Sequence, residues 1–351
     1  MTERISNFQV QQNQIVLGTS RNRVVLLCAQ TTEVLWEQPP SSKITAAPAF
    51  ADEAIIVGSY NGSPHDVHTL SSLHRESGQQ HWCKEGSGAF WRPRYRNGVV
   101  YTGSTDQNLY AIDVGTGDVK WSCETSSALS PQIAIGKDTV HCATQGKILV
   151  RPSVPRTVYA IDMESGEKLW SYDNKKRWLP ELFQTAKLFH SPLFFEDKVY
   201  LTAGSELWVF HSRTGKKHLV KDMELNHFLQ PFHSQCINEQ HLCLSSPHAS
   251  EIIVVTPEKA DILLRVKASS YAVALHDSTL YWSDHDGTFH ALDIDTSTEK
   301  WVITFPKEMF CSPIVEGKRM YAGLNETLYC IDIETGQTLW RYSLPSEQIE
   351  S

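Results

Sequence analysis

The chain has 351 residues, of which 41% are hydrophobic and 21% are charged, a balance typical of a folded protein and unlike that of a disordered one. Its 32 basic and 40 acidic residues give a net charge of −8, which argues against nucleic acid as a partner, because nucleic-acid-binding surfaces carry an excess of Lys and Arg. The length fits either two ordinary domains of about 150 residues or one large repetitive domain.

The first 18 residues contain neither the apolar stretch nor the small-residue cleavage site of a signal peptide, so we expect a cytoplasmic protein. No apolar run approaches the roughly 18 residues of a membrane span, and none is expected. The eight cysteines include no adjacent pair and no CxxC spacing, which removes the usual signal for a zinc ribbon or an attached haem. Cysteines of this kind are typical of small apolar core residues.

One 13-residue pattern recurs eight times along the chain. Four copies align without gaps, at residues 109–121 (LYAIDVGTGDVKW), 158–170, 289–301 and 328–340, and four weaker copies share their phase. In chain order the copies close at Trp36, Trp82, Trp121, Trp170, Leu219, Leu264, Trp301 and Trp340. These closing residues are on average about 43 residues apart, which is the length of one four-stranded propeller blade.

Each copy predicts a hairpin of two strands. The alternating LYAID segment is typical of a strand, and the Asp that ends it, such as Asp113, is suited to accept backbone N–H groups in the turn. Four residues before the closing residue lies a Gly, such as Gly117, which can adopt a positive φ; Ser297 takes this place in one copy. The closing Trp is expected to begin the outer strand and to pack on the adjoining sheet.

A second pair of strands precedes each hairpin, and the inner one lies near a recurring small residue followed by Pro, as in Ser130-Pro131. Four strands in eight units predict an all-β fold, a single eight-bladed β-propeller of four-stranded antiparallel blades, as one domain over residues 1–351. The approximate blades are 1–38, 39–84, 85–123, 124–172, 173–221, 222–266, 267–303 and 304–351. With an inner strand near Ile5–Val10, the ring is expected to close without exchanging a strand between its ends.

The AxDxxTGxxxW core of these copies resembles the repeat of the pyrroloquinoline-quinone-like (PQQ-like) propellers, which include the tryptophan-docking quinoprotein dehydrogenases. The resemblance covers nearly the whole chain. The dehydrogenases of that family carry a disulfide between adjacent cysteines over the quinone and long insertions, and this sequence has neither. The resemblance therefore implies a member of the non-dehydrogenase type, and we expect no bound quinone and no other cofactor.

The residues before the inner-strand Pro should ring the mouth of the central channel, on the face formed by the loops that enter the inner strands, which we call the top face. The plain copies have a small residue there, as in Ser-Pro or Ala-Pro. The departures place large polar or aromatic side chains at the mouth, and Trp178 is expected to overhang it; these candidate ligand-binding residues are Trp91, Arg92, His190, Gln230, Tyr271 and Trp178. Together they suit a small anionic or planar ligand, with Arg92 holding a carboxylate, or a protein partner.

Long insertions at 60–69, 144–157 and 171–187 also fall on the top face, which favours it as the binding face. Within the first of them, His65, Asp66 and His68 are too few for a recognisable zinc site, so no metal is predicted. Two functions remain open. The first is binding of a ligand or partner protein through the top face and channel mouth; the alternative is a cofactor-independent lyase, cyclase or hydrolase that uses His190 and Arg92.

Overall fold

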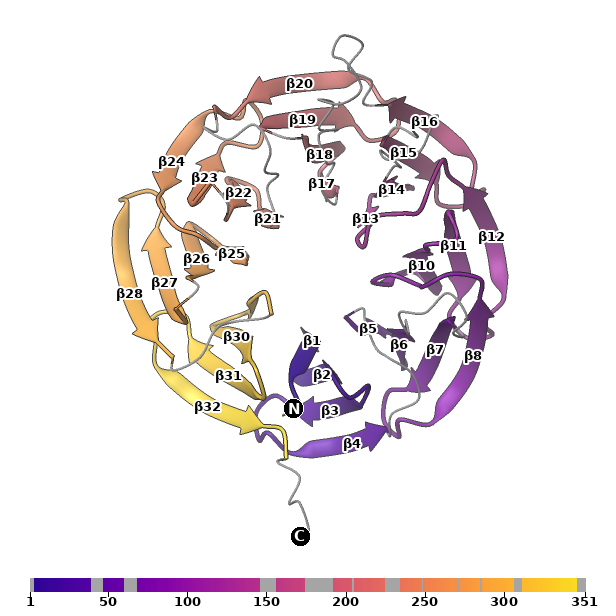
Figure 1. The fold of residues 1–351 in the computed structure, drawn as a ribbon, viewed down its shortest axis with the longest axis horizontal. Coiled ribbons are helices and arrows are strands. Elements are labelled where there is room, and N and C mark those ends of the chain that lie inside the picture. The colour runs from indigo at the N-terminus through magenta and orange to yellow at the C-terminus, as the bar shows by residue number, and fades with distance from the viewer. Residues whose placement is uncertain are drawn as a thin grey trace, which may run out of the picture.

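The strands of this protein form eight separate sheets arranged as a ring around a central opening (Figure 1). The computed structural model describes residues 3–38, 47–59, 68–145, 156–173, 192–203, 205–224, 234–247, 249–270, 272–284, 286–305 and 311–345. Each sheet has four antiparallel strands, so the predicted eight-bladed β-propeller is confirmed. All regular elements in these ranges are strands. The described residues therefore include no helix that could cross a membrane.

Each blade is built from four consecutive strands that run from the inside of the ring to the outside (Figure 1). The first four blades are β1 (Ile5–Gln11), β2 (Gln14–Thr19), β3 (Val24–Cys28) and β4 (Val34–Gln38); β5 (Ala49–Ala51), β6 (Ala54–Gly58), β7 (His68–His74) and β8 (Gln80–Gly86); β9 (Arg94–Arg96), β10 (Val99–Gly103), β11 (Asn108–Asp113) and β12 (Val119–Glu124); β13 (Ala134–Ile135), β14 (Thr139–Ala143), β15 (Thr157–Asp162) and β16 (Lys168–Asp173).

The remaining four blades follow the same plan. They are β17 (Leu193–Phe195), β18 (Lys198–Ala203), β19 (Glu206–His211) and β20 (Lys217–Asp222); β21 (Ser234–Ile237), β22 (Leu242–Ser246), β23 (Glu251–Val255) and β24 (Ile262–Val266); β25 (Val273–His276), β26 (Thr279–Ser283), β27 (Thr288–Asp293) and β28 (Thr298–Thr304); β29 (Ile314–Glu316), β30 (Arg319–Leu324), β31 (Thr327–Asp332) and β32 (Thr338–Ser343).

Burial follows the position of a strand in its blade. The second strands are buried along almost their whole length, and β6 and β14 at every residue, because neighbouring blades cover both of their faces. The outer strands, such as β12, expose most residues and bury few. The core is therefore a series of apolar layers between adjacent blades; one of them joins Tyr101 of the third blade to Val140 and Ile161 of the fourth.

The hairpins of all eight copies have the predicted turn geometry. Asp162, for example, accepts the backbone N–H groups of Glu164 and Ser165, both at 3.0 Å. The residue four places before the closing residue has a positive φ in every copy, including the weak ones: Thr32, Gly78, Gly117, Gly166, Gly215, Ala260, Ser297 and Gly336. This common geometry confirms that the four weak copies are aligned in the correct phase.

The closing tryptophans link each blade to the next. The indole N–H of Trp121 donates to the carbonyl of Met163 at 3.0 Å, and that of Trp170 donates to the carbonyl of Ser212 at 2.7 Å. Five of the six rings lie on the hairpin glycine of the following blade, so closely that a β-carbon added at Gly166 would be 2.7 Å from Cδ2 of Trp121. The hairpin position that follows the sixth, Trp340, is Thr32. The prediction that Trp begins its outer strand is wrong by two residues, because β12 begins at Val119.

The ring closes as predicted, without an exchanged strand, since the first blade takes all four of its strands from β1 to β4. Side-chain packing joins the two ends instead. Ile5 and Phe8 share an apolar cluster with Tyr321 and Leu344 of the eighth blade. The backbone N–H of Ile5 also donates to the carbonyl of Asn325 at 2.7 Å.

Candidate functional site

Two of the predicted channel-mouth residues, Trp91 and Arg92, lie in the described part of the chain, in the loop that enters β9. The backbone of Trp91 is fixed by an N–H bond to the carbonyl of Gly103 at 2.9 Å, and its own carbonyl accepts the hydroxyl of Thr102 at 2.9 Å. The Trp91 side chain packs, partly buried, against the apolar layer between the third and fourth blades. Its buried indole N–H has no acceptor in the described part of the chain.

Arg92 lies at a local irregularity of the inner strand. Arg94 pairs with Tyr101 in the β9–β10 register, which would place Trp91 opposite Ser104, yet Ser104 pairs with Phe90. The chain thus holds one extra residue between Phe90 and Arg94, which is a β-bulge, and bulges commonly redirect side chains beside functional sites. The side chain of Arg92 therefore does not have to follow the alternating side-chain directions of β9.

The guanidinium of Arg92 is a partly buried cation that no described residue neutralises. Its Nε atom is buried and has no hydrogen-bond acceptor within the described ranges. Burial, and second the positive charge of Arg94, lowers the pKa of Arg92 from 12.5 to about 10. Burial also lowers the pKa of Arg94, which forms no ion pair with a described residue. Two adjacent cations in this condition favour the approach of an anion.

Arg94 and Arg96 extend this feature along β9, so that Arg92, Arg94 and Arg96 form what we call the arginine row. Arg94 and Arg96 lie on the same side of the strand, because they are two residues apart and paired in regular register with β10. Arg96 donates to the carbonyl of Gly136 in the fourth blade. Arg92 was the only member of the row predicted from the sequence; the recurrence of Arg at 92, 94 and 96 is the signal that reveals the whole row.

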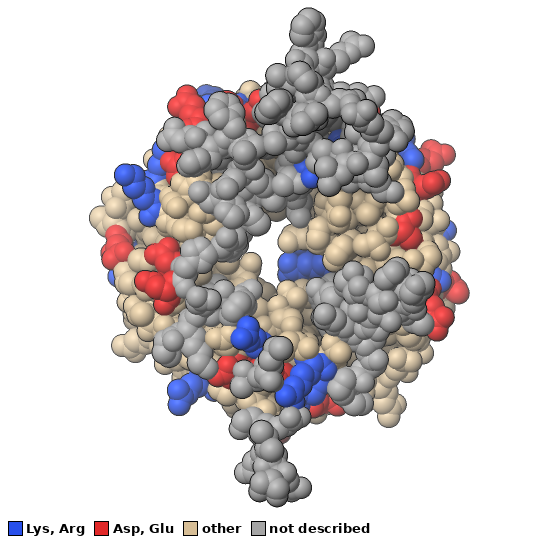
Figure 2. Space-filling model, in the orientation of Figure 1, with Lys and Arg blue, Asp and Glu red and all other residues tan. Residues whose placement is uncertain are grey.

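The innermost strands border the central opening of the ring (Figure 1), and β9 is the innermost strand of the third blade, next to β10. Figure 2 shows that this opening remains when all atoms are drawn, and that Lys or Arg atoms reach its edge on the side of β10. The arginine row belongs to that blade. The opening therefore has a cationic wall on at least one side, within a protein of net charge −8.

The other predicted site residues lie outside the described residues. This applies to His190, Gln230, Tyr271 and Trp178, and to most of the three top-face insertions. Of the histidines considered for a metal, His68 begins β7 and is buried, and His65 lies outside the described ranges. Within those ranges no group of three His, Cys, Asp or Glu side chains is placed to hold a metal ion.

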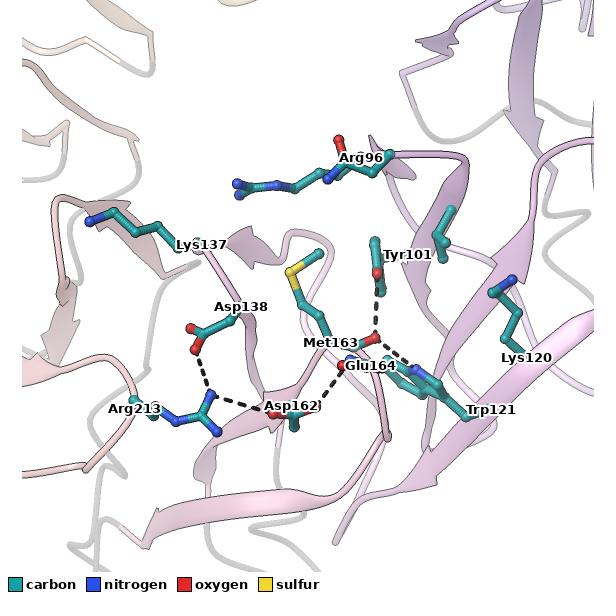
Figure 3. Close-up of a pocket in the computed structure, with 12 residues that line it drawn as sticks. Arg96, Tyr101, Lys120, Trp121, Lys137, Asp138, Asp162, Met163, Glu164 and Arg213 are labelled. Atoms are coloured by element: carbon teal, nitrogen blue, oxygen red, sulfur yellow. Dashed lines mark hydrogen bonds and ion pairs between the residues drawn. The ribbon is translucent and has the colours of Figure 1, made fainter.

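A second hollow lies between the third and fourth blades, on the face formed by the outer hairpins, which we call the hairpin face (Figure 3). It has a volume of about 590 Å³. Its lining includes Arg96, Lys120, Lys137, Asp138, Asp162 and Arg213 around an apolar floor of Tyr101, Trp121 and Met163. Sequence reasoning missed this hollow, because it forms only where two hairpins and two inner turns meet.

Three of the cations around this hollow, Arg213, Lys120 and Lys137, are already paired with carboxylates. Arg213 lies between Asp138 at 2.5 Å and Asp162 at 3.4 Å, as the dashed lines in Figure 3 show. Lys120 pairs with Asp113 at 3.4 Å, and Lys137 pairs with Asp197 at 3.3 Å. A ligand would have to displace these partners, whereas an anion at Arg92 or Arg94 displaces none of the described residues. The channel side of the arginine row is therefore the better candidate site.

Comparison with known proteins gives one family. The family model described as outer membrane protein assembly factor BamB matches residues 3–87, 63–263 and 261–350. The outer membrane protein assembly factor BamB of Francisella tularensis (strain SCHU S4) is 32% identical over 82 residues, a segment that covers 23% of this chain and 16% of that relative. The chain thus matches only a small part of this curated relative's length.

Solved structures with the same fold have little sequence in common with this chain. The BamB structure from Moraxella catarrhalis has a TM-score of 0.66 at 14% identity, covering 93% of this chain and 91% of that one. The computationally designed Ika8 protein has a TM-score of 0.74 at 14% identity, covering 97% and 96%. A quinohemoprotein alcohol dehydrogenase from Pseudomonas putida HK5 has a TM-score of 0.65 at 12% identity, covering 93% and 71%.

Proposed function

Since the chain belongs to the PQQ-like propeller family of outer membrane protein assembly factor BamB, we propose that it is a binding propeller without chemistry of its own, and that it holds a partner protein at the channel mouth around Arg92. The observation that carries this proposal is the partly buried pair Arg92 and Arg94, which no described residue neutralises. Natural proteins rarely bury a charge without a partner, so such a pair is suited to an anionic group supplied by another molecule.

Binding is favoured over catalysis by the surroundings of Arg92. An enzyme needs an acid, a base or a nucleophile within hydrogen-bonding distance of the group that orients its substrate. No described His, Asp, Glu or Cys side chain hydrogen-bonds to Arg92 or Arg94. Arginine remains charged at neutral pH and does not exchange protons, so the described part of this site offers recognition only.

The name of the relatives suggests a specific partner, namely a protein that takes part in outer membrane assembly. The cytoplasmic location predicted from the sequence speaks for a different partner. Fractionation of the cells that make this protein distinguishes the two proposals, because a protein of outer membrane assembly must be recovered outside the cytoplasm.

Site-directed photocrosslinking in those cells tests the proposed binding face. Ser87 and Asp118 are exposed and lie at opposite ends of one blade region, Ser87 in the top-face loop before β9 and Asp118 in the β11–β12 hairpin. We expect a photoreactive residue at Ser87 to capture a defined protein, and Arg92→Gln to abolish that capture. Capture from Asp118 but not from Ser87 would show that the top face is the wrong one.

A further inference from the structure

We propose that the arginine row binds an extended acidic segment of the partner, in which two carboxylate side chains lie two residues apart. The inference rests on the proposed function and specifies its chemistry. It is carried by three features of β9 and the loop before it: the spacing of the arginines, their lack of acidic partners among the described residues, and their place on the innermost strand.

The spacing of the row matches that of an extended peptide. Residues of a strand rise about 3.3 Å each, so Arg94 and Arg96, two residues apart on one side of β9, recur at roughly 6.6 Å. Alternate side chains of an extended peptide recur at the same distance. A segment that runs along β9 can therefore present one carboxylate to each arginine, and the planar guanidinium is suited to two parallel hydrogen bonds with a carboxylate.

Two other arginines of this protein show what the row lacks. Arg23 is held by Glu3 and Glu37, each at 2.5 Å, and Arg265 is held by Glu251 at 2.8 Å. Arg92 and Arg94 have no such carboxylate in the described part of the chain, and the charge of Arg94 disfavours the charged form of Arg92. Carboxylates from outside would supply the missing partner and remove this repulsion.

The position of the row selects a thin occupant. β9 borders the central opening, and an extended chain is thinner than a helix or a folded domain (Figures 1 and 2). A single strand of nucleic acid is also thin and anionic. It is disfavoured because the whole protein carries a net charge of −8, which repels a long polyanion more strongly than it repels two carboxylates.

The test is fluorescence anisotropy with the full-length protein and labelled synthetic peptides of equal charge. One peptide carries two Glu residues separated by a Val, and the other carries two adjacent Glu residues. The variants are Arg92→Gln, Arg94→Gln, Arg96→Gln and Arg94→Lys, with Lys259→Gln as a control. Lys259 is exposed in the β23–β24 hairpin, so its change alters the net charge equally at a distant place. Unfolding curves confirm that each variant is folded.

We expect the spaced peptide to bind at least tenfold more tightly than the adjacent one, and to weaken as salt rises. Arg92→Gln, Arg94→Gln and Arg96→Gln should each reduce the affinity at least tenfold. Arg94→Lys should reduce it less, and Lys259→Gln should leave it unchanged. Equal binding of the two peptides, no binding of either, or tighter binding of a single-stranded oligonucleotide would each overturn this proposal. If a photoreactive residue at Ser87 captured a partner and any of these results were also obtained, the proposed binding function would be kept and only the proposal of an acidic segment would be rejected.

Discussion

Thr32→Gly should stabilise the protein, although glycine usually weakens a folded chain. Thr32 occupies the hairpin position that is glycine wherever else a closing Trp packs on it, and it has a φ of 61°. A β-branched residue in this conformation is strained by about 1 to 2 kcal/mol. The neighbouring closing residue, Trp340 of the eighth blade, packs on the first blade, but its indole N–H is buried without an acceptor in the described ranges.

The expected magnitude combines three effects. Removing the strain contributes about 1 to 2 kcal/mol, and a new hydrogen bond from Trp340 to the carbonyl of Ala29 contributes about 1 kcal/mol more. Ala29 is the expected acceptor because it follows the strand end, as Met163 does in the fourth blade. The greater freedom of glycine in the unfolded chain subtracts about 0.5 to 1 kcal/mol. The net gain should be about 1 to 2 kcal/mol.

Thermal unfolding measures this gain as a rise in Tm of about 2 °C for a chain of this length. Gly166→Ala is the matched control at the same hairpin position. Gly166 has a φ of 74° and contacts Trp121, so this substitution should lower the free energy of unfolding by about 2 kcal/mol. If Thr32→Gly lowered the Tm, or if Gly166→Ala left it unchanged, then the pairing of a closing Trp with a hairpin Gly would not be a source of stability.

Three further predictions concern the tryptophan links, the arginine row and the turn carboxylates. Trp121→Phe should lower the free energy of unfolding, measured in urea, by about 1 kcal/mol more than Trp340→Phe does. Of these two residues, only Trp121 donates its indole N–H to a carbonyl in the described structure. Arg92→Gln should raise the free energy of unfolding by about 1 to 2 kcal/mol at pH 7, since a pKa lowered to about 10 marks a penalty on the charged form. This gain is full below pH 10 and should shrink as the pH rises above 10, where the wild-type group loses its proton; a destabilised variant would indicate a structural role instead. The backbone N–H of Ser165 donates a hydrogen bond to Asp162, and this bond is the largest of the causes that lower the pKa of Asp162. The carboxylate of Asp162 therefore stabilises the fold above pH 4, and this contribution is lost as the pH falls below 3.8, the usual pKa of Asp. Urea midpoints between pH 2 and 6 should accordingly fall less steeply for Asp162→Asn than for the wild type.

The fold was predictable from the sequence because its determinants are local and repeated. A strand that ends in Asp162, a positive φ at Gly166 and a closing Trp170 specify one hairpin, and eight such hairpins specify the ring. The hairpin glycines are required by their positive φ and also by the Trp ring that packs on them, and this second requirement was not predictable from one copy. It involves two blades at once, and it appears only when Trp121 is seen to lie on Gly166.

The candidate site was predicted less completely, because it depends on deviations from the repeat. Arg92 departs from the usual small residue before Pro93 and was identified for that reason. Arg94 and Arg96 belong to a regular strand, and alternating arginines in a strand do not by themselves indicate a binding site in a sequence. Their significance depends on the position of β9 at the opening and on the absence of a described carboxylate near Arg94, both of which require the structure.

The way in which the ring closes has a consequence for how this chain can be rearranged. Every blade is contiguous in sequence, and Ile5 and Leu344 already meet in one cluster, so the two ends could be joined by a short linker and new ends opened between any other pair of blades. Such circular permutants should fold to the same ring, which a propeller with a shared strand allows only at certain positions. Duplication or loss of a whole blade would likewise leave every remaining sheet intact, so propellers of this construction can change their number of blades without an incomplete intermediate.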